Sequence, residues 1–120
     1  MTLQECYAAL GGNYEDVLGR MHSERMIQKF VLKFLQDGNY DTLCRALAAG
    51  TVEEAFRAAH TIKGMCLNLS FDRLAASSVE MTEALRSGDL AGALAVKDQV
   101  DADYKHTTDA IRAFQAGLPA

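Results

Sequence analysis

The sequence has little that would break a helix or cross-link the fold. Its only proline is Pro119, and no segment alternates polar and apolar residues for long enough to predict a strand. The three cysteines show no C-x-x-C spacing, which fits reduced, buried thiols better than a secreted disulfide framework. We therefore expect an all-α protein whose cysteines are unpaired.

Long uncharged runs and clusters of basic residues are also absent. No uncharged run of about 18 residues and no basic-then-apolar leader is found, so we expect a cytoplasmic protein without a membrane segment. The net charge is −4 and the 12 Lys and Arg residues are scattered, which argues against a nucleic-acid partner. The cysteines and histidines lack paired metal-ligand spacing, and no phosphate-binding loop or kinase motif occurs, so we expect neither a metal nor an ATP site.

The length of 120 residues and the 49% apolar composition predict one domain over residues 1–120. Two short helices, over residues 3–10 and 14–21, are expected to form an N-terminal cap of about residues 1–22. The bundle core of about residues 23–116 is expected to contain four long helices, at about 23–49 with a kink near Gly38, 52–69, 71–86 and 90–115. Long helices with short connections predict an up-down four-helix bundle.

Capping residues mark the expected helix starts. Ser23 and Asp89 are predicted N-caps, and Thr51 with Glu54 forms a capping-box pattern. Ser70 is the predicted cap of the helix that follows it. The inward residues expected on the last helix include Leu94, Val100, Tyr104, Ile111 and Phe114.

The helix expected from about Val52 to Leu69 has two distinct faces. At about 100° per residue, one side is a buried stripe of Val52, Ala55, Ala59, Ile62, Cys66 and Leu69. His60 lies well over 90° from the centre of that stripe, on an outward stripe with Glu53, Arg57, Gly64 and Leu67, and Lys63 lies at the border. Glycine inside a helix costs about 0.5–1 kcal/mol relative to alanine, so Gly64 suggests close approach by another molecule.

These residues carry a family resemblance. The run His60-Thr61-Ile62-Lys63-Gly64, followed by Asn68-Leu69, resembles the H-x-x-K-G signature of histidine-containing phosphotransfer (HPt) domains. The similarity extends to the helix pattern of roughly residues 12–114. One residue departs from the family pattern, since Ser70 stands where the family often has glycine.

The resemblance implies a phosphocarrier without an ATP site of its own. His60 would carry a phosphoryl group on its outer ring nitrogen, Nε2, to or from an aspartate of a response-regulator receiver domain. The receiver would supply that aspartate and Mg²⁺, so this chain would need no cofactor. The partner would be a receiver domain, a hybrid histidine kinase or both, and we expect a monomer.

Five further residues have expected roles. Lys63 would stabilise the phosphoryl group, and Gly64 would give clearance to the partner. Arg57, Leu67 and Arg86 are candidates for partner binding, and Arg86 can also be read as a solvated charge because surface ion pairs contribute little.

Two other interpretations fit the same sequence. The chain could be a helical protein-binding module that has the HPt shape and is not phosphorylated. It could also be the phosphoacceptor domain of a larger histidine kinase.

Overall fold

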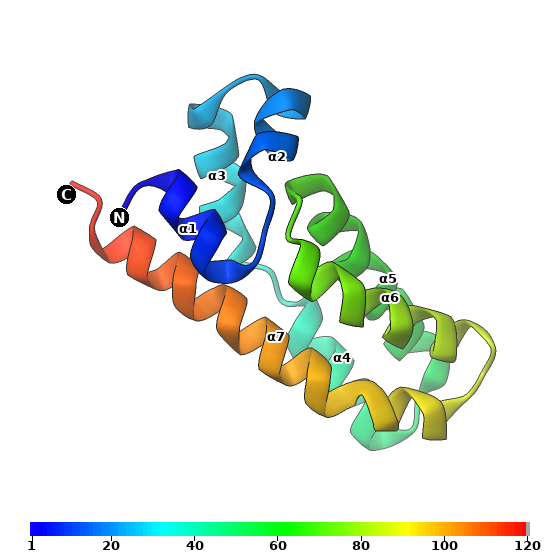
Figure 1. Cartoon of the computed structure of the whole chain (residues 1–120). Coiled ribbons are helices and arrows are strands. Elements are labelled where there is room, and N and C mark those ends of the chain that lie inside the picture. Colours follow the sequence, from blue (N-terminus) through cyan, green and yellow to red (C-terminus); the bar gives the residue numbers. More distant parts are fainter. Residues whose placement is uncertain (120) are drawn as a thin grey trace.

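The computed structural model describes residues 1–119, which form seven helices and no strand (Figure 1). The expected all-α fold is therefore confirmed. The helices are α1 Leu3–Leu10, α2 Tyr14–Met21, α3 Glu24–Phe34, α4 Asn39–Ala49, α5 Val52–Leu69, α6 Asp72–Arg86 and α7 Leu90–Ala116.

The four helices α4 to α7 form the bundle. Each packs on the next, α4 on α5, α5 on α6 and α6 on α7, and short connections reverse the chain between them. With 27 residues, α7 is about 40 Å long at 1.5 Å per residue, close to the 43 Å longest dimension of the molecule. Helix α7 therefore runs along almost the full length of the molecule.

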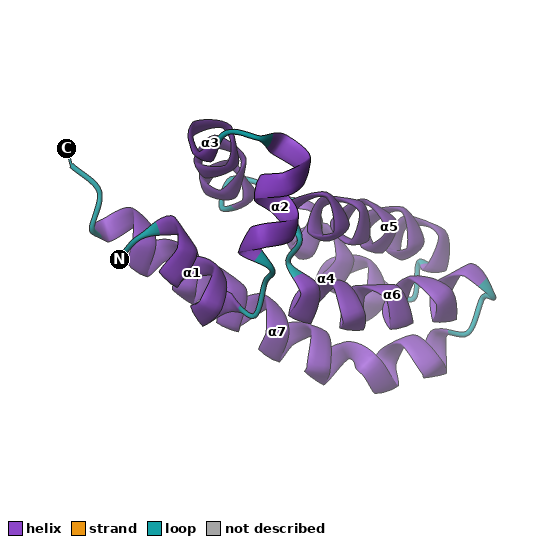
Figure 2. Cartoon of the chain, turned by 45° about the horizontal axis from the view of Figure 1, so that its top comes forward, coloured by secondary structure: helices purple, strands orange, loops and turns teal. Residues whose placement is uncertain are grey.

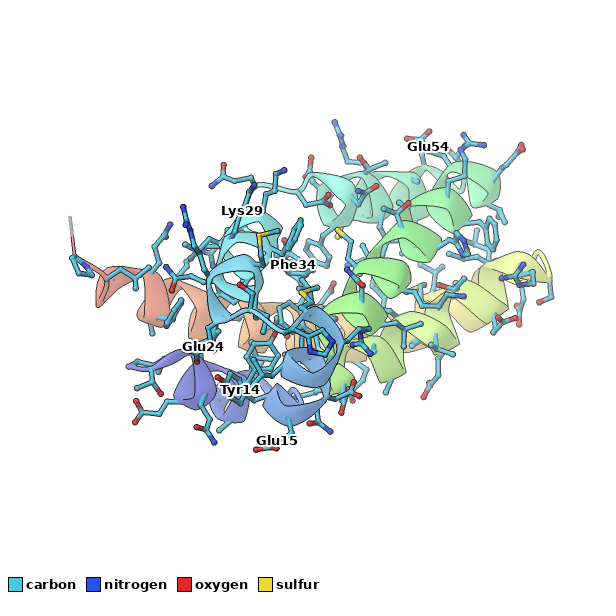
Figure 3. All side chains as sticks on the ribbon, turned by 90° about the horizontal axis from the view of Figure 1, so that it is seen from above. Tyr14, Glu15, Glu24, Lys29, Phe34 and Glu54 are labelled. Atoms are coloured by element: carbon cyan, nitrogen blue, oxygen red, sulfur yellow. The ribbon has the colours of Figure 1, made fainter. Side chains whose placement is uncertain are left out.

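The three helices α1 to α3 lie at one end of this bundle. Figure 2 shows α1 lying along α7, and the thiol of Cys6 on α1 contacts the backbone oxygen of Ala110 on α7 at 3.7 Å. Helix α2 packs on α3, and the hydroxyl of Tyr14 donates to the carboxylate of Glu24, which are labelled in Figure 3. The backbone nitrogen of Met1 also lies near Gly117, so both ends of the chain meet at this end of the molecule (Figure 1).

The expected kinked helix over residues 23–49 is wrong, because α3 ends at Phe34 and α4 begins at Asn39. The end of α3 tightens into a turn in which the backbone N–H of Asp37 donates to the oxygen of Phe34 at 3.2 Å. The carboxylate of Asp37 then accepts hydrogen bonds from the backbone N–H of Asn39 at 2.9 Å and from its side-chain amide at 2.8 Å. The N-cap of α4 is Gly38, which has no side chain to cap the helix, and Asp37 satisfies the N–H group of the first helical residue in its place.

Two of the four predicted helix caps are confirmed. Ser23 accepts from the backbone N–H of Met26 at 3.2 Å, and Asp89 accepts from that of Gly92 at 2.8 Å. The capping box at Thr51 is wrong, although α5 does begin at Val52. The Thr51 side chain accepts no capping hydrogen bond, although its backbone conformation is close to that of Asp89, which does cap.

The predicted cap at Ser70 is also wrong, because this residue ends α5 and does not cap α6. Its φ of 57° and ψ of 41° place it in the left-handed region, and Phe71 occupies the N-cap position of α6. Its hydroxyl instead forms hydrogen bonds with Asp16 and Arg20 of α2.

The inward residues of α7 are mostly as expected. Val100, Ile111 and Phe114 are buried and Tyr104 is half-buried, but Leu94 is 46% exposed. Ala93, with 0% exposure, takes the inward position at this level, and Leu94, about 100° further round the helix, faces solvent.

The cysteines are unpaired, as expected, but only two of the three are buried. Cys6 and Cys66 are enclosed in the core, whereas Cys44 is half-buried. Burial raises the pKa of the Cys6 thiol to about 11 and that of the Cys66 thiol to about 12, so both remain protonated and unreactive at neutral pH.

Candidate functional site

Helix α5 presents His60 to solvent. The expected buried stripe is observed, since Ala55, Ala59, Ile62, Cys66 and Leu69 are buried and Val52 is half-buried. The expected outward stripe is also observed, with Glu53, Arg57, His60, Gly64 and Leu67 all exposed. The predicted direction of the His60 side chain is therefore confirmed.

Gly64 lies one turn after His60, and the space above it is open. A Cβ built at Gly64 would meet no other described residue within 4 Å. Packing within the chain therefore does not require a glycine at this position, while the helix loses about 0.5–1 kcal/mol by having one.

One turn before His60, the ring of Phe56 stacks on the imidazole. The two ring centroids are 5.7 Å apart and the ring planes differ by 18°. The guanidinium of Arg86, from the end of α6, lies over the same Phe56 ring, 5.0 Å from its centroid. Arg86 also pairs with Glu83 at 3.2 Å. Arg86 is thus connected to His60 through Phe56.

Phe56 was not among the residues singled out from the sequence. Its spacing of four residues from His60 was the available signal, because side chains at i and i+4 on a helix are neighbours. The apolar pattern predicts burial alone, and it places Phe56 at the border of the core stripe, where the side chain is half-buried. This position does not distinguish Phe56 from an ordinary packing residue.

Lys63 and Arg57 lie on opposite sides of His60 and differ in their partners. Lys63 is half-buried, and no carboxylate among residues 1–119 lies within ion-pair distance of it. Arg57 pairs with Glu53 at 3.6 Å, and both side chains are largely exposed. Exposed pairs of this kind contribute little to stability. The ammonium of Lys63 is consequently the available positive charge on the border of the His60 face.

Leu67 extends the exposed face by one more turn. Its side chain is 54% exposed, the largest value among the large hydrophobic residues of the chain. His60, Gly64 and Leu67 therefore form a continuous strip along α5 that holds an imidazole, a bare backbone turn and an apolar side chain.

The Hpt domain family model matches residues 26–114. The chain belongs to the Hpt domain family. Members of this family act in phosphotransfer within two-component signalling systems. Searches of the curated proteins and of the solved structures found no match to the chain.

Helices α1 and α2 lie outside the part of the chain that matches the Hpt model, and they fix the C-terminal end of α5. The Arg20 guanidinium on α2 donates to the backbone oxygens of Leu67 at 3.2 Å and Asn68 at 3.1 Å, and to the hydroxyl of Ser70 at 2.6 Å. A cation there satisfies free carbonyl groups and complements the negative end of the helix dipole.

Ser70 completes this connection between α2 and the Hpt domain. Its hydroxyl donates to the carboxylate of Asp16 at 2.6 Å. That hydrogen bond lowers the pKa of Asp16, and the nearby charge of Arg20 lowers it further. Ser70 adopts a left-handed conformation that glycine adopts without strain, and its hydroxyl gives it contacts that a glycine would lack.

Helix α1 and the loop after it each add one hydrogen bond to the same turn. The hydroxyl of Tyr7 on α1 donates to the backbone oxygen of Leu69 at 2.8 Å, and the backbone N–H of Asn13 in the loop donates to the backbone oxygen of Ser70 at 2.9 Å. A Cβ at Gly12 would lie 2.7 Å from the Ser70 oxygen, so this close approach requires a glycine. The turn after α5 is therefore held from three directions.

A pocket of about 310 Å³ lies between α3 and α5 of the Hpt domain. It is lined by Phe30, Lys33, Phe34, Gln36, Asp37, Met65, Asn68 and Leu69. His60 does not line it, and the sequence did not predict it.

Within residues 1–119, no helix combines the length and apolar character needed to cross a membrane. The same residues contain no group of three or more His, Cys, Asp or Glu side chains placed to hold a metal ion.

Proposed function

We propose that this chain is a phosphocarrier of a multistep two-component phosphorelay, and that His60 is its phosphoacceptor. The supporting observation is the exposed imidazole of His60 on α5, followed one turn later by the open backbone at Gly64. The other two histidines lack this setting. His22 ends α2 and His106 lies on α7, both exposed and without a neighbouring Lys-Gly pair.

The transfer follows from the chemistry of the imidazole ring. A neutral imidazole has a lone pair on one nitrogen, in the plane of the ring, and this lone pair can attack phosphorus. In the proposed step the Nε2–P bond forms while the O–P bond to the receiver's aspartate breaks, and the aspartate leaves as a carboxylate. The partner's Mg²⁺ would offset charge on the phosphoryl oxygens.

Two positively charged side chains of this protein are candidates for stabilising the phosphoryl group during transfer. Charge spreads over the equatorial oxygens in phosphoryl transfer, so positioned positive charges contribute strongly. Lys63 has no ion-pair partner among residues 1–119, and we propose that it binds a phosphoryl oxygen. Arg86, whose guanidinium lies over the Phe56 ring, is the second candidate.

The exposed strip of α5 is the proposed docking surface for the receiver. Gly64 gives clearance, and Leu67 offers an apolar contact at one end of the strip. Arg57, at its edge, is positioned to meet a carboxylate of the partner. A carrier must expose this surface to both donor and acceptor, so we expect it to work as a monomer.

The test is phosphoryl transfer from a phosphorylated receiver domain, followed as acid-labile phosphate on this chain. We expect transfer to the wild type and none to His60→Gln. His106→Gln is the matched control, because it removes another exposed helical histidine, and it should behave as the wild type does. Equal labelling of His60→Gln, or no labelling of the wild type by any receiver or kinase encoded beside it, would reject the proposal.

A further inference from the structure

We propose that Phe56 is a positioning residue for the phosphoacceptor: its ring orients the His60 imidazole and also holds the Arg86 guanidinium. This inference rests on the proposed function of His60. It is carried by two contacts to one ring, the imidazole stacked at 5.7 Å and the guanidinium at 5.0 Å.

The stack restrains the imidazole without blocking the nucleophile. An exposed histidine on a helix can rotate about both side-chain torsions, and these rotations move the reactive nitrogen away from an incoming phosphorus atom. The Phe56 ring lies nearly parallel to the imidazole, with an interplanar angle of 18° and a centroid distance of 5.7 Å. The lone pair of Nε2 lies in the plane of the imidazole, so an offset ring stacked at its face leaves the reacting edge free.

The two turns that flank His60 have opposite properties. Helical side chains lean toward the N-terminus, so the imidazole rests on the turn that carries Phe56. The following turn carries Gly64, above which no described residue lies within 4 Å of a Cβ position. One side of the imidazole is supported and the other is left to the partner.

Phe56 is itself firmly placed. It is half-buried and packs against the hydrophobic core, so its ring has little freedom to move with the imidazole. Because the core fixes the Phe56 ring, the stacked ring can restrict the movement of the exposed His60 side chain.

The same ring also holds a cation, the guanidinium of Arg86. Arg86 is held by the face of Phe56 and by the carboxylate of Glu83. A guanidinium stacked on an aromatic ring keeps its N–H groups directed outward at its edge, where phosphoryl oxygens can bind. Phe56 therefore prepares both the nucleophile and one of its counter-charges.

The experiment compares Phe56→Leu with Phe56→Tyr, and uses Phe30→Leu as the matched control. Phe30 is another half-buried phenylalanine packed on the core, and it lies in the pocket between α3 and α5, which His60 does not line. Leucine keeps apolar volume and loses the aromatic face, whereas tyrosine keeps both. The first readout is the NMR spectrum of the His60 ring protons, assigned with His60→Gln.

The second readout is the rate of phosphorylation by phosphoramidate, which needs no protein partner. In this reaction the N–P bond of the donor breaks, a new N–P bond forms at His60, and ammonia leaves with a proton. An aromatic contact of ordinary strength corresponds to about a two- to ten-fold change in rate, so we expect that slowing in Phe56→Leu. Phe56→Tyr should recover to within about two-fold of the wild type, and Phe30→Leu should match it.

We expect the His60 ring resonances to move in Phe56→Leu and to stay near their wild-type positions in the other two variants. Unchanged resonances and an unchanged rate in Phe56→Leu would overturn the inference, as would a slow Phe56→Tyr variant. The NMR readout is made on the unphosphorylated protein, so it tests the stack even if the proposed phosphorylation fails. Thermal unfolding of each variant verifies that the bundle is intact.

Discussion

Helix α5 is open along one face and closed at one end. Along its exposed face, His60, Gly64 and Leu67 meet solvent, and the ring of Phe56 stacks on the imidazole. At its C-terminal end, hydrogen bonds from α1, from α2 and from the loop between them converge on residues 67–70. The helix is thus secured away from the residues proposed to do the chemistry.

The two regions also differ in their relation to the family match. The open face lies inside the matched residues 26–114, whereas the groups that close the end come from residues before 26. A docking surface needs accessible groups, and these contribute little to folding. The N-terminal helices can add stability because they bind backbone groups at the end of α5, and the His60 and Gly64 positions stay free.

Arg20→Ala tests the closed end and should have the largest effect on stability. It removes donors to two backbone oxygens and to the Ser70 hydroxyl, and hydrogen bonds from charged groups contribute about 1.5–3 kcal/mol. The Arg20 side chain is 43% exposed, so we expect a loss of about 1–2 kcal/mol in the free energy of unfolding, measured with urea.

Arg57→Ala is the matched control on the open face. It removes an exposed ion pair at 3.6 Å and should cost roughly 0–0.5 kcal/mol. If Arg57→Ala destabilises the protein as much as Arg20→Ala does, the contrast between the two regions of α5 is wrong.

Ser70 allows a finer test of the same end, with two substitutions. Ser70→Ala loses the hydrogen bonds to Asp16 and Arg20 and keeps the left-handed strain, so it should cost about 1–2 kcal/mol. Ser70→Gly loses the same bonds but adopts a φ of 57° freely, so it should be less destabilising than Ser70→Ala by about 0.5–1 kcal/mol. Urea unfolding of both variants measures the difference, and the reverse order would show that backbone strain is unimportant here.

The effect of Ser70→Ala should also depend on pH. The Ser70 hydroxyl holds the pKa of Asp16 below its ordinary value of 3.8. A lowered carboxyl pKa stabilises the fold above the ordinary pKa, and this stabilisation is lost as the pH falls through the lowered pKa. The advantage of the wild type over Ser70→Ala should therefore be constant near neutral pH and should shrink below about pH 4.

Substitutions at Gly64 test the open face and should change stability in the opposite direction. Gly64→Ala should stabilise the protein by about 0.5–1 kcal/mol, because alanine favours a helix and meets no neighbour there. Transfer from a receiver should slow in the order wild type, Gly64→Ala, Gly64→Gln, as the side chain crowds the docking surface. Unchanged transfer kinetics in Gly64→Gln would remove the argument for clearance.

The sequence predicted most of the helices and the direction of His60, because both depend on local spacing. The 3.6-residue period assigned the faces of α5. Ser23 and Asp89 marked the starts of their helices, because each side-chain oxygen accepts from the backbone N–H three residues later.

The errors came from residues whose roles depend on distant contacts or on a choice between two local structures. Ser70 looks like a cap in the sequence, but its hydroxyl bonds to Asp16 and Arg20, which lie 54 and 50 residues away in the chain. The hydrogen bond from Asn39 to Asp37 favours a break between α3 and α4 over a kink in one continuous helix. The link from Phe56 to Arg86 joins two helices and needs the packing of α5 on α6 to be known.

The position of the chain ends has a practical consequence. Met1 and Gly117 lie together where α1 meets the last turns of α7, and the exposed strip of α5 belongs to a different part of the surface (Figure 1). A fluorophore, an affinity tag or a tether to a sensor chip can therefore be attached at either terminus while His60 stays accessible. Immobilised in this way, the protein can be offered to candidate receivers one after another, and its selectivity among them can be measured directly.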